Sequence, residues 1–247
     1  MRVLARRDLL RLTGAAALAG GLTSCGDDVA EAMPPEEGEL TGPEDALRRL
    51  LDGNERFMKG ESTTLNESAE RRNLVSGGQE PFAIILSCVD SRVPPELVFD
   101  RGLGDLFVIR TAGHVVDDVV MGSIEYGAEH LHIPLIMVMG HEGCGAVKAT
   151  VEAVEAERDG SASGAEAPPA IPPANSIGAL VERIRPAVSD VIDKGGDTVD
   201  KAVTANVFRV MEQLLTSPTL KARVGEGQLR IVGSRYDLDS GRVELVP

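Results

Sequence analysis

The chain has 247 residues, 43% of them hydrophobic, so it is long and apolar enough to bury the core of one substantial domain. Its formal net charge of −14 argues against electrostatic binding of phosphate groups and excludes nucleic-acid binding as its main function. It contains no Trp and only 3% aromatic residues, so the core must consist mainly of Val, Ile, Leu and Ala.

Residues 1–24 predict an export signal rather than part of the fold. A basic start leads into a short run of small and apolar residues, which is too short for a good membrane span. The pair Arg6-Arg7 in "RRDLL" resembles the twin arginine of a Tat signal, and "LTSC", which ends at Cys25, resembles a bacterial lipobox. The resemblance implies an exported bacterial lipoprotein, periplasmic or on the cell surface, anchored to the membrane through Cys25. The alternative is an ordinary secretory signal in which Cys25 occurs by chance.

Two segments are predicted to lack regular structure. Residues 25–42 are acidic, contain proline and have little apolar content, which suits a disordered, solvated tether between lipid and domain. Residues 158–176 are rich in Gly, Ser, Ala and Pro and predict a flexible loop. Core-like sequence follows this loop, so a single domain is predicted over 43–247.

Helical and strand patterns alternate along this domain. Helical spacing of apolar residues begins at Pro43 and stops at Gly60, and a weaker helix is predicted over 67–76. The remaining helices are predicted over 117–132, 145–157, 177–192 and 200–215. Short apolar runs predict buried strands over 81–88, 105–113 and 133–141, and residues 228–246 predict a closing pair of strands. The alternation predicts an α/β fold with a mainly parallel sheet flanked by helices.

Three metal-binding side chains are predicted to meet at one edge of that sheet. Cys88 ends the first strand, His141 ends the third, and Cys144 follows at the start of a helix. Open α/β sheets bind ligands at the carboxyl ends of their strands. Two thiolates and one imidazole suit Zn2+, and three protein ligands leave a fourth position open, which is typical of catalytic zinc. One Zn2+ per chain is therefore the predicted cofactor.

Asp90 and Arg92 are predicted to control the fourth coordination position of the zinc ion. When it is paired with Arg92, Asp90 can accept a hydrogen bond from zinc-bound water. Without this pairing it could ligate the metal itself and close the site. Zinc would lower the pKa of its water toward about 7 and so supply a hydroxide nucleophile near neutral pH.

Taken together, these residues resemble the β-carbonic anhydrases. The matching segments include "CVDSRVPPE", "GLGDLFVIRTAGH", "GSIEYGAEHL", "GHEGCGAVKA" and "VGSRYDLDSG". The resemblance implies a zinc lyase that interconverts CO2 and bicarbonate by attack of zinc-bound hydroxide. It also implies a four- or five-stranded sheet and a homodimer or higher homo-oligomer with the site at the dimer interface. By motif, the zinc ligands fall on Cys88, His141 and Cys144. The catalytic pair falls on Asp90 and Arg92.

The resemblance also implies a substrate pocket. Gln79 stands nine residues before Cys88, where some members have a glutamine that the partner subunit contributes. Phe107 and Tyr126 match aromatic pocket positions, and the backbone of Gly145 matches a position close to substrate. His114 departs from the family, which usually has Asn there. It is either a tolerated polar replacement or a proton relay.

Three other interpretations stay open at this point. A non-catalytic zinc-binding surface lipoprotein would need the three ligands but not the Asp90–Arg92 pair. The same zinc shell could also serve a hydrolase of a CO2 analogue such as COS or CS2. Finally, export permits a Cys88–Cys144 disulfide without metal.

Overall fold

The computed structural model describes residues 38–64, 66–159 and 176–247. These residues belong to a compact unit that runs from Glu36 to Pro247. The predicted signal, Cys25, most of the predicted tether and nearly all of the predicted loop lie outside the described residues. None of the helices in the described ranges is long and apolar enough to cross a membrane.

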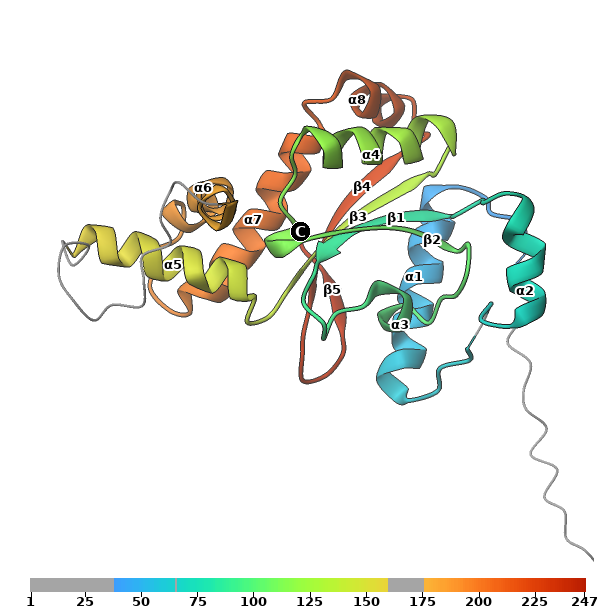
Figure 1. Cartoon of the computed structure of the whole chain (residues 1–247), viewed down its shortest axis with the longest axis horizontal. Helices are drawn as coiled ribbons and strands as arrows, with labels where there is room; N and C mark the ends of the chain where they lie inside the picture. Colours follow the sequence, from blue (N-terminus) through green and yellow to red (C-terminus); the bar gives the residue numbers. More distant parts are fainter. Residues whose placement is uncertain (1–37, 65, 160–175) are drawn as a thin grey trace, which may run out of the picture. The chain divides into compact units, whose positions relative to one another are not determined.

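A five-stranded sheet with the order β2-β1-β3-β4-β5 forms the centre of the unit (Figure 1). Four strands are parallel, namely β1 (Ala83–Cys88), β2 (Leu106–Thr111), β3 (Leu135–His141) and β4 (Arg230–Tyr236). The short β5 (Val243–Leu245) pairs with β4 in the antiparallel direction. The predicted α/β fold with a mainly parallel sheet is confirmed. Because β1 has β2 on one side and β3 on the other, the strand order reverses at β1, which creates a ligand-binding crevice at the carboxyl ends.

The helices largely follow the predicted ranges: α1 (Pro43–Lys59), α2 (Ala69–Leu74), α4 (Asp118–His130), α5 (Gly145–Arg158), α6 (Ser176–Ser189) and α7 (Thr198–Leu214). Two short helices were not predicted, α3 (Pro95–Val98) and α8 (Pro218–Gly225). Both are too short to show a helical period. A signal for α8 was nevertheless present, since Ser217 caps the helix by accepting the N–H of Leu220 and a proline follows it directly.

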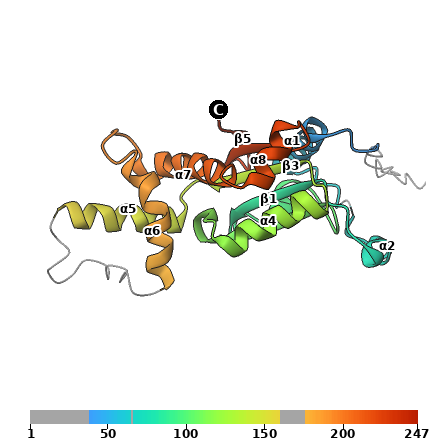
Figure 2. The same cartoon turned by 90° about the horizontal axis from the view of Figure 1, so that it is seen from above.

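Side chains of the central strands are buried on both faces of the sheet, which explains their nearly continuous apolar sequence. Ile84 and Leu86 pack in a cluster with residues of α4, α7 and α8. Ala83 and Ile85 point to the opposite face and pack with residues of α1 and α3. Figure 2 shows α1 and α4 on opposite sides of β1 and β3. Burial on both faces holds the ends of β1 and β3 in fixed positions.

Asp100 ties α1 to the segment after α3. Its carboxylate accepts the Nε–H of Arg56 at 2.6 Å and both the backbone N–H and the hydroxyl of Thr63, at 2.9 and 2.8 Å. Burial alone would raise the pKa of Asp100, but the hydrogen bonds from Arg56 and Thr63 outweigh it and hold that pKa below the usual 3.8. The contribution of ionised Asp100 to the stability of the fold is therefore fully present above about pH 4. It is lost as pH falls through the pKa of Asp100 in the folded protein.

Replacing Asp100 with Asn is expected to lower the free energy of unfolding at pH 7 by about 2 kcal/mol, because it leaves Arg56 without its anionic partner. Asn tolerates the left-handed backbone at this position, where φ is 48°, so the change isolates the charge. Urea unfolding at pH 7 and at pH 2.5 measures the effect. The deficit relative to wild type should shrink at the lower pH, and an equal deficit at both would contradict the ion-pair explanation.

Candidate metal centre

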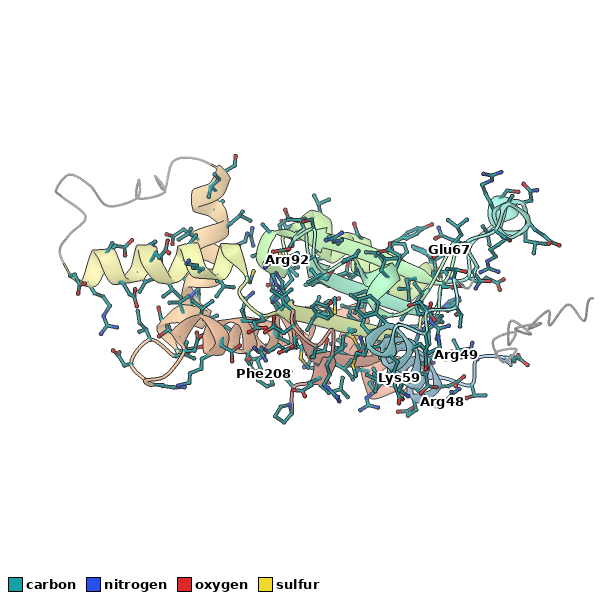
Figure 3. All side chains as sticks on the ribbon, turned by 90° about the horizontal axis from the view of Figure 1, so that it is seen from below. Arg48, Arg49, Lys59, Glu67, Arg92 and Phe208 are labelled. Atoms are coloured by element: carbon teal, nitrogen blue, oxygen red, sulfur yellow. The ribbon has the colours of Figure 1, made fainter. Side chains whose placement is uncertain are left out.

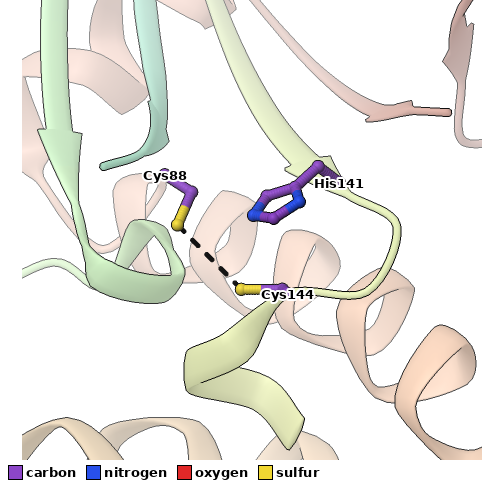
Figure 4. Close-up of side chains that lie close together, drawn as sticks. All are labelled: Cys88, His141 and Cys144. Carbon is purple, nitrogen blue, oxygen red and sulfur yellow. Dashed lines mark hydrogen bonds between the residues drawn. The ribbon is translucent and has the colours of Figure 1, made fainter. Parts of the chain in front are cut away.

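Three ligand side chains converge where β1 and β3 end (Figure 4). The ligand atoms of Cys88, His141 and Cys144 all lie within 4.8 Å of one another, and all three side chains are buried. Cys88 is the last residue of β1, His141 is the last residue of β3, and Cys144 immediately precedes α5. The predicted convergence of these three residues is thus found in the structure.

The two sulfur atoms are not bonded to each other. The Sγ atoms of Cys88 and Cys144 are 4.0 Å apart, about twice the length of a disulfide bond, and both cysteines are free. The structure therefore holds the pair in an arrangement suited to ligation rather than in the disulfide that the sequence left open.

The imidazole of His141 presents an unpaired nitrogen to this cluster. Its Nδ1 lies 2.8 Å from the carbonyl oxygen of Glu142, which can only accept, so Nδ1 carries the proton and Nε2 carries the lone pair. Nε2 is buried and has no hydrogen-bond partner among the described residues. A buried lone pair beside two sulfur atoms is what a metal ligand requires, and the hydrogen bond from Nδ1–H to the Glu142 carbonyl fixes the orientation of the ring. The donor set and its geometry thus fit Zn2+.

The two thiols differ in how readily they lose a proton. The hydrogen bond between them lowers the pKa of Cys88 in spite of its burial. The same bond raises the pKa of Cys144, and burial raises it further, while the backbone N–H groups at the start of α5 act in the opposite direction. Cys88 therefore loses its proton more readily than Cys144. Because zinc binds cysteine as the thiolate, binding a metal through both sulfur atoms must also release the proton of Cys144.

Asp90 and Arg92 form a two-pronged pair beside the cluster. Asp90 Oδ1 accepts the Nε–H and the backbone N–H of Arg92, both at 3.0 Å, and its Oδ2 accepts a second guanidinium N–H at 2.8 Å. This pairing holds the pKa of Asp90 well below its usual range. Asp90 Oδ2 lies 4.0 Å from His141 Nε2. Figure 3 shows Arg92 at the end of the sheet from which α5 departs. The structure has the Arg92-paired arrangement, and ligation by Asp90 in a closed state stays a prediction.

Arg110, at the end of β2, was missed by the sequence analysis. Its Nε–H donates to the carbonyl of Cys88 at 2.8 Å, and a second N–H donates to the carbonyl of Asp90 at 2.6 Å. The guanidinium thereby holds the turn that carries both a ligand and the acidic residue. A signal existed, since an arginine at the end of an apolar strand needs a partner. The sequence did not show that the partner is backbone.

Replacing Arg110 with Met is expected to lower kcat/KM about 10- to 100-fold, because the turn that orients Cys88 and Asp90 loses the two hydrogen bonds that the guanidinium donates to its carbonyl groups. Stopped-flow CO2 hydration on protein with an unchanged circular dichroism spectrum measures the effect. The control is Arg209→Met, which removes only an exposed ion pair with Asp190. Equal rates in the two variants would contradict the positioning role.

Three of the four residues implied for the substrate pocket lie away from the cluster of their own chain. Gln79 is exposed and lies before the start of β1, whereas Cys88 is the last residue of that strand, which is about 17 Å long. Phe107 pairs in register with Ile84, near the start of β1, and its ring centroid is 6.5 Å from that of Tyr126. Only Gly145, the first residue of α5, adjoins the cluster.

His114 is completely buried and directly follows Gly113, the residue of the turn Ala112–His114 that contacts Cys88. Burial lowers its pKa to about 4, so the ring stays neutral near pH 7. Its Nε2 faces the side-chain amide of Asn206 at 3.0 Å rather than solvent. These features count against the proton-relay interpretation, because a relay must exchange protons near neutral pH.

Known proteins resemble this chain in sequence and in fold. The family model described as "Carbonic anhydrase" matches residues 83–243. Carbonic anhydrase 2 of Mycobacterium tuberculosis is 40% identical over 206 residues, covering 83% of this chain and 93% of that protein. The structure of the β-carbonic anhydrase CcaA superposes with a TM-score of 0.60 at 26% identity, covering 81% of this chain and 95% of that one. The Coccomyxa β-carbonic anhydrase in complex with acetazolamide gives 0.58 at 27% identity, covering 81% and 86%.

The mainly parallel sheet is shared with solved β-class carbonic anhydrases, and the chain belongs to the carbonic anhydrase family. It is a lyase that catalyses the reversible hydration of CO2 to bicarbonate. The interpretation as a non-catalytic zinc-binding lipoprotein is therefore set aside.

Proposed function

We propose that the enzyme works with one Zn2+ per chain, held by Cys88, His141 and Cys144. The observation that carries this proposal is the buried, unpaired Nε2 of His141 beside two free sulfur atoms. Zinc prefers four tetrahedral ligands, so three protein ligands leave one position for the reaction. The chemistry that the ion supplies when bound is Lewis-acid activation of water, whose pKa falls toward about 7.

Asp90 orients the attacking water. Its carboxylate is ionised and fixed by Arg92, and it accepts a hydrogen bond from the water so that an oxygen lone pair faces CO2. A bond forms between the water oxygen and the carbon of CO2, one proton passes to buffer, and bicarbonate leaves. Arg92 contributes by holding Asp90, and Arg110 by holding the turn.

Metal analysis combined with stopped-flow CO2 hydration tests this proposal on the purified full-length protein. We expect about one zinc per chain and a rate above buffer that a chelator removes and added Zn2+ restores. An equal rate in zinc-free protein would overturn it, as would zinc-loaded protein without activity on CO2. Parallel assays with COS and CS2 test the analogue-hydrolase interpretation.

We also propose that two copies of the chain assemble through β2 and α4. β2 is an edge strand of the sheet, and its residues are only half-buried. On α4, Val119 and Tyr126 are 78% and 49% exposed, which leaves apolar surface beside that edge. A second copy would cover this surface. Gln79, Phe107 and Tyr126 of one chain would then lie near the Cys-His-Cys cluster of the other chain. That assembly would explain why these residues lie far from the cluster of their own chain.

Light scattering tests the assembly. We expect wild type at twice the chain mass or a higher multiple, and Tyr126→Asp shifted toward monomer, because a carboxylate would have to be buried in the interface. The control is Ile177→Asp, which changes an equally exposed apolar residue on α6. A monomeric wild type would contradict the proposal.

A third proposal concerns the residues before the domain. The twin arginine and the "LTSC" segment support export and attachment of lipid to Cys25, with residues 25–42 as a tether. Radiolabelled palmitate should enter wild type but not Cys25→Ser, and the variant should leave the membrane fraction. Unlabelled wild type in the soluble fraction would favour an ordinary secretory signal.

A further inference from the structure

The loop after β2 contacts the sulfur of Cys88. Gly113, in the short turn Ala112–His114, donates its N–H to Cys88 Sγ at 3.4 Å. Gly113 has a φ of 65° and His114 a φ of 46°, so two successive residues adopt the left-handed backbone. This conformation suits glycine but is unfavourable for histidine. The N–H therefore reaches the sulfur through a backbone conformation that other parts of the fold must hold.

Asn206, from the middle of α7, holds this loop. Its side-chain Nδ2 donates to the carbonyl of Gly113 at 2.9 Å and faces the Nε2 of His114 at 3.0 Å. Both Asn206 and His114 are buried. The loop also fits closely against α6, since a Cβ on Gly113 would lie 2.7 Å from a methyl carbon of Ile184. A single amide from a distant helix thus binds the backbone carbonyl of Gly113 and the side chain of His114.

These contacts determine where the proton of His114 lies. The carbonyl of Gly113 only accepts, so Asn206 must present its N–H groups, and His114 Nε2 must accept one of them. The ring is therefore neutral and carries its proton on Nδ1. A second proton, on Nε2, would place an N–H of His114 opposite an N–H of Asn206, and two donors cannot form a hydrogen bond. His114 acts as a fixed acceptor for Asn206.

We propose that Asn206 and His114 are positioning residues that act through Gly113, holding its N–H against the Cys88 sulfur and so setting how strongly that sulfur donates to the metal. The inference rests on the proposed function, because it requires a metal at Cys88. An N–H directed at a thiolate stabilises its charge, which favours the deprotonated ligand and reduces donation to the ion. Losing the hydrogen bond from the Gly113 N–H should therefore weaken metal binding near neutral pH. In the protein that still binds metal, the Cys88 sulfur should donate more electron density to the ion.

The first test uses the wild-type chain loaded with 113Cd and labelled with 15N. A coupling between the cadmium nucleus and the Gly113 amide proton, transmitted through the sulfur, is expected. If the loaded protein shows no such coupling, the first step of the inference fails. This measurement needs no variant, so it decides the question even if substitutions at the buried positions prevent folding.

The second test compares His114→Asn with His114→Leu, because an amide oxygen can still accept from Asn206 and a methyl group cannot. We expect His114→Leu and Asn206→Leu to bind Zn2+ about 10-fold or more weakly in chelator competition. With Co2+ in place of zinc, their sulfur-to-metal charge-transfer band should move to longer wavelength. His114→Asn should stay within about threefold of wild type.

The control for these variants is Gln213→Leu, which removes another side-chain amide of α7 that donates to the same segment, at the carbonyl of Val116. It should leave both the affinity and the band unchanged. Wild-type affinity and band in folded His114→Leu would overturn the inference, and so would equal weakening by Gln213→Leu. If wild type itself binds no zinc, the proposed function fails. If wild type and all variants bind zinc alike, only this inference fails.

Discussion

Replacing Cys144 with Ala is expected to remove zinc from the purified enzyme and to lower kcat/KM for CO2 hydration by more than about 10³-fold. The change deletes one of two sulfur ligands at a buried position, where no other described cysteine can replace it. The remaining Cys88 and His141 cannot complete the coordination of zinc. Metal content after dialysis and stopped-flow rates measure both effects.

The matched control is Thr150→Val, a buried position on the same helix where only a hydroxyl bonded to the Ala146 carbonyl is lost. This variant should keep one zinc per chain and nearly the wild-type rate. Retention of zinc by Cys144→Ala would contradict the assigned ligand set. Zinc loss in both variants would instead indicate that disturbing α5 is enough to release the metal.

Replacing Asp90 with Asn is expected to leave zinc in place and to lower kcat about 10²- to 10³-fold, because the amide no longer provides an ionised acceptor for the attacking water. Arg92→Met should have a similar effect, since the carboxylate then loses the partner that holds it in place. Both side chains are accessible at the edge of the site, so the fold should tolerate the changes. Zinc content and pre-steady-state rates separate loss of metal from loss of chemistry.

The double variant Asp90→Asn/Arg92→Met sharpens this prediction. If Arg92 acts through Asp90, the double variant should be about as slow as Asp90→Asn alone. Effects that multiply would contradict this and would assign Arg92 its own contact with substrate. Metal loss in Asp90→Asn would place Asp90 among the ligands instead.

The arrangement of the sheet could be predicted because its cause is local. Apolar runs such as "AIILSC" are long enough to be buried on both faces, and helical patterns separate them, so parallel strands with crossover helices follow. The ligands could be placed for the same reason, since Cys88 and His141 each end a buried strand. The carboxyl ends of neighbouring parallel strands must meet.

The residues that support the ligands could not be predicted in this way. Arg110 bonds to main-chain carbonyls, and every residue has a carbonyl, so the sequence carries no mark of the partner. Asn206 lies 93 residues from Gly113, and only the packing of α7 against the sheet brings the two together. Gln79, Phe107 and Tyr126 were implied by family resemblance alone. Their distance from the cluster becomes visible only once the strand register is known.

The spacing of the two sulfur ligands also gives the metal a mechanical role. Cys88 and Cys144 are 56 residues apart, and the chain between them contains β2 and α4. An ion bound to both would act as a removable crosslink that closes this long loop and restricts the unfolded chain, so metal supply would set the resistance of the protein to unfolding. The closed loop carries the surface proposed for subunit contact. Metal starvation would then loosen the quaternary structure as well as stop turnover, and the two losses should follow the same metal titration curve.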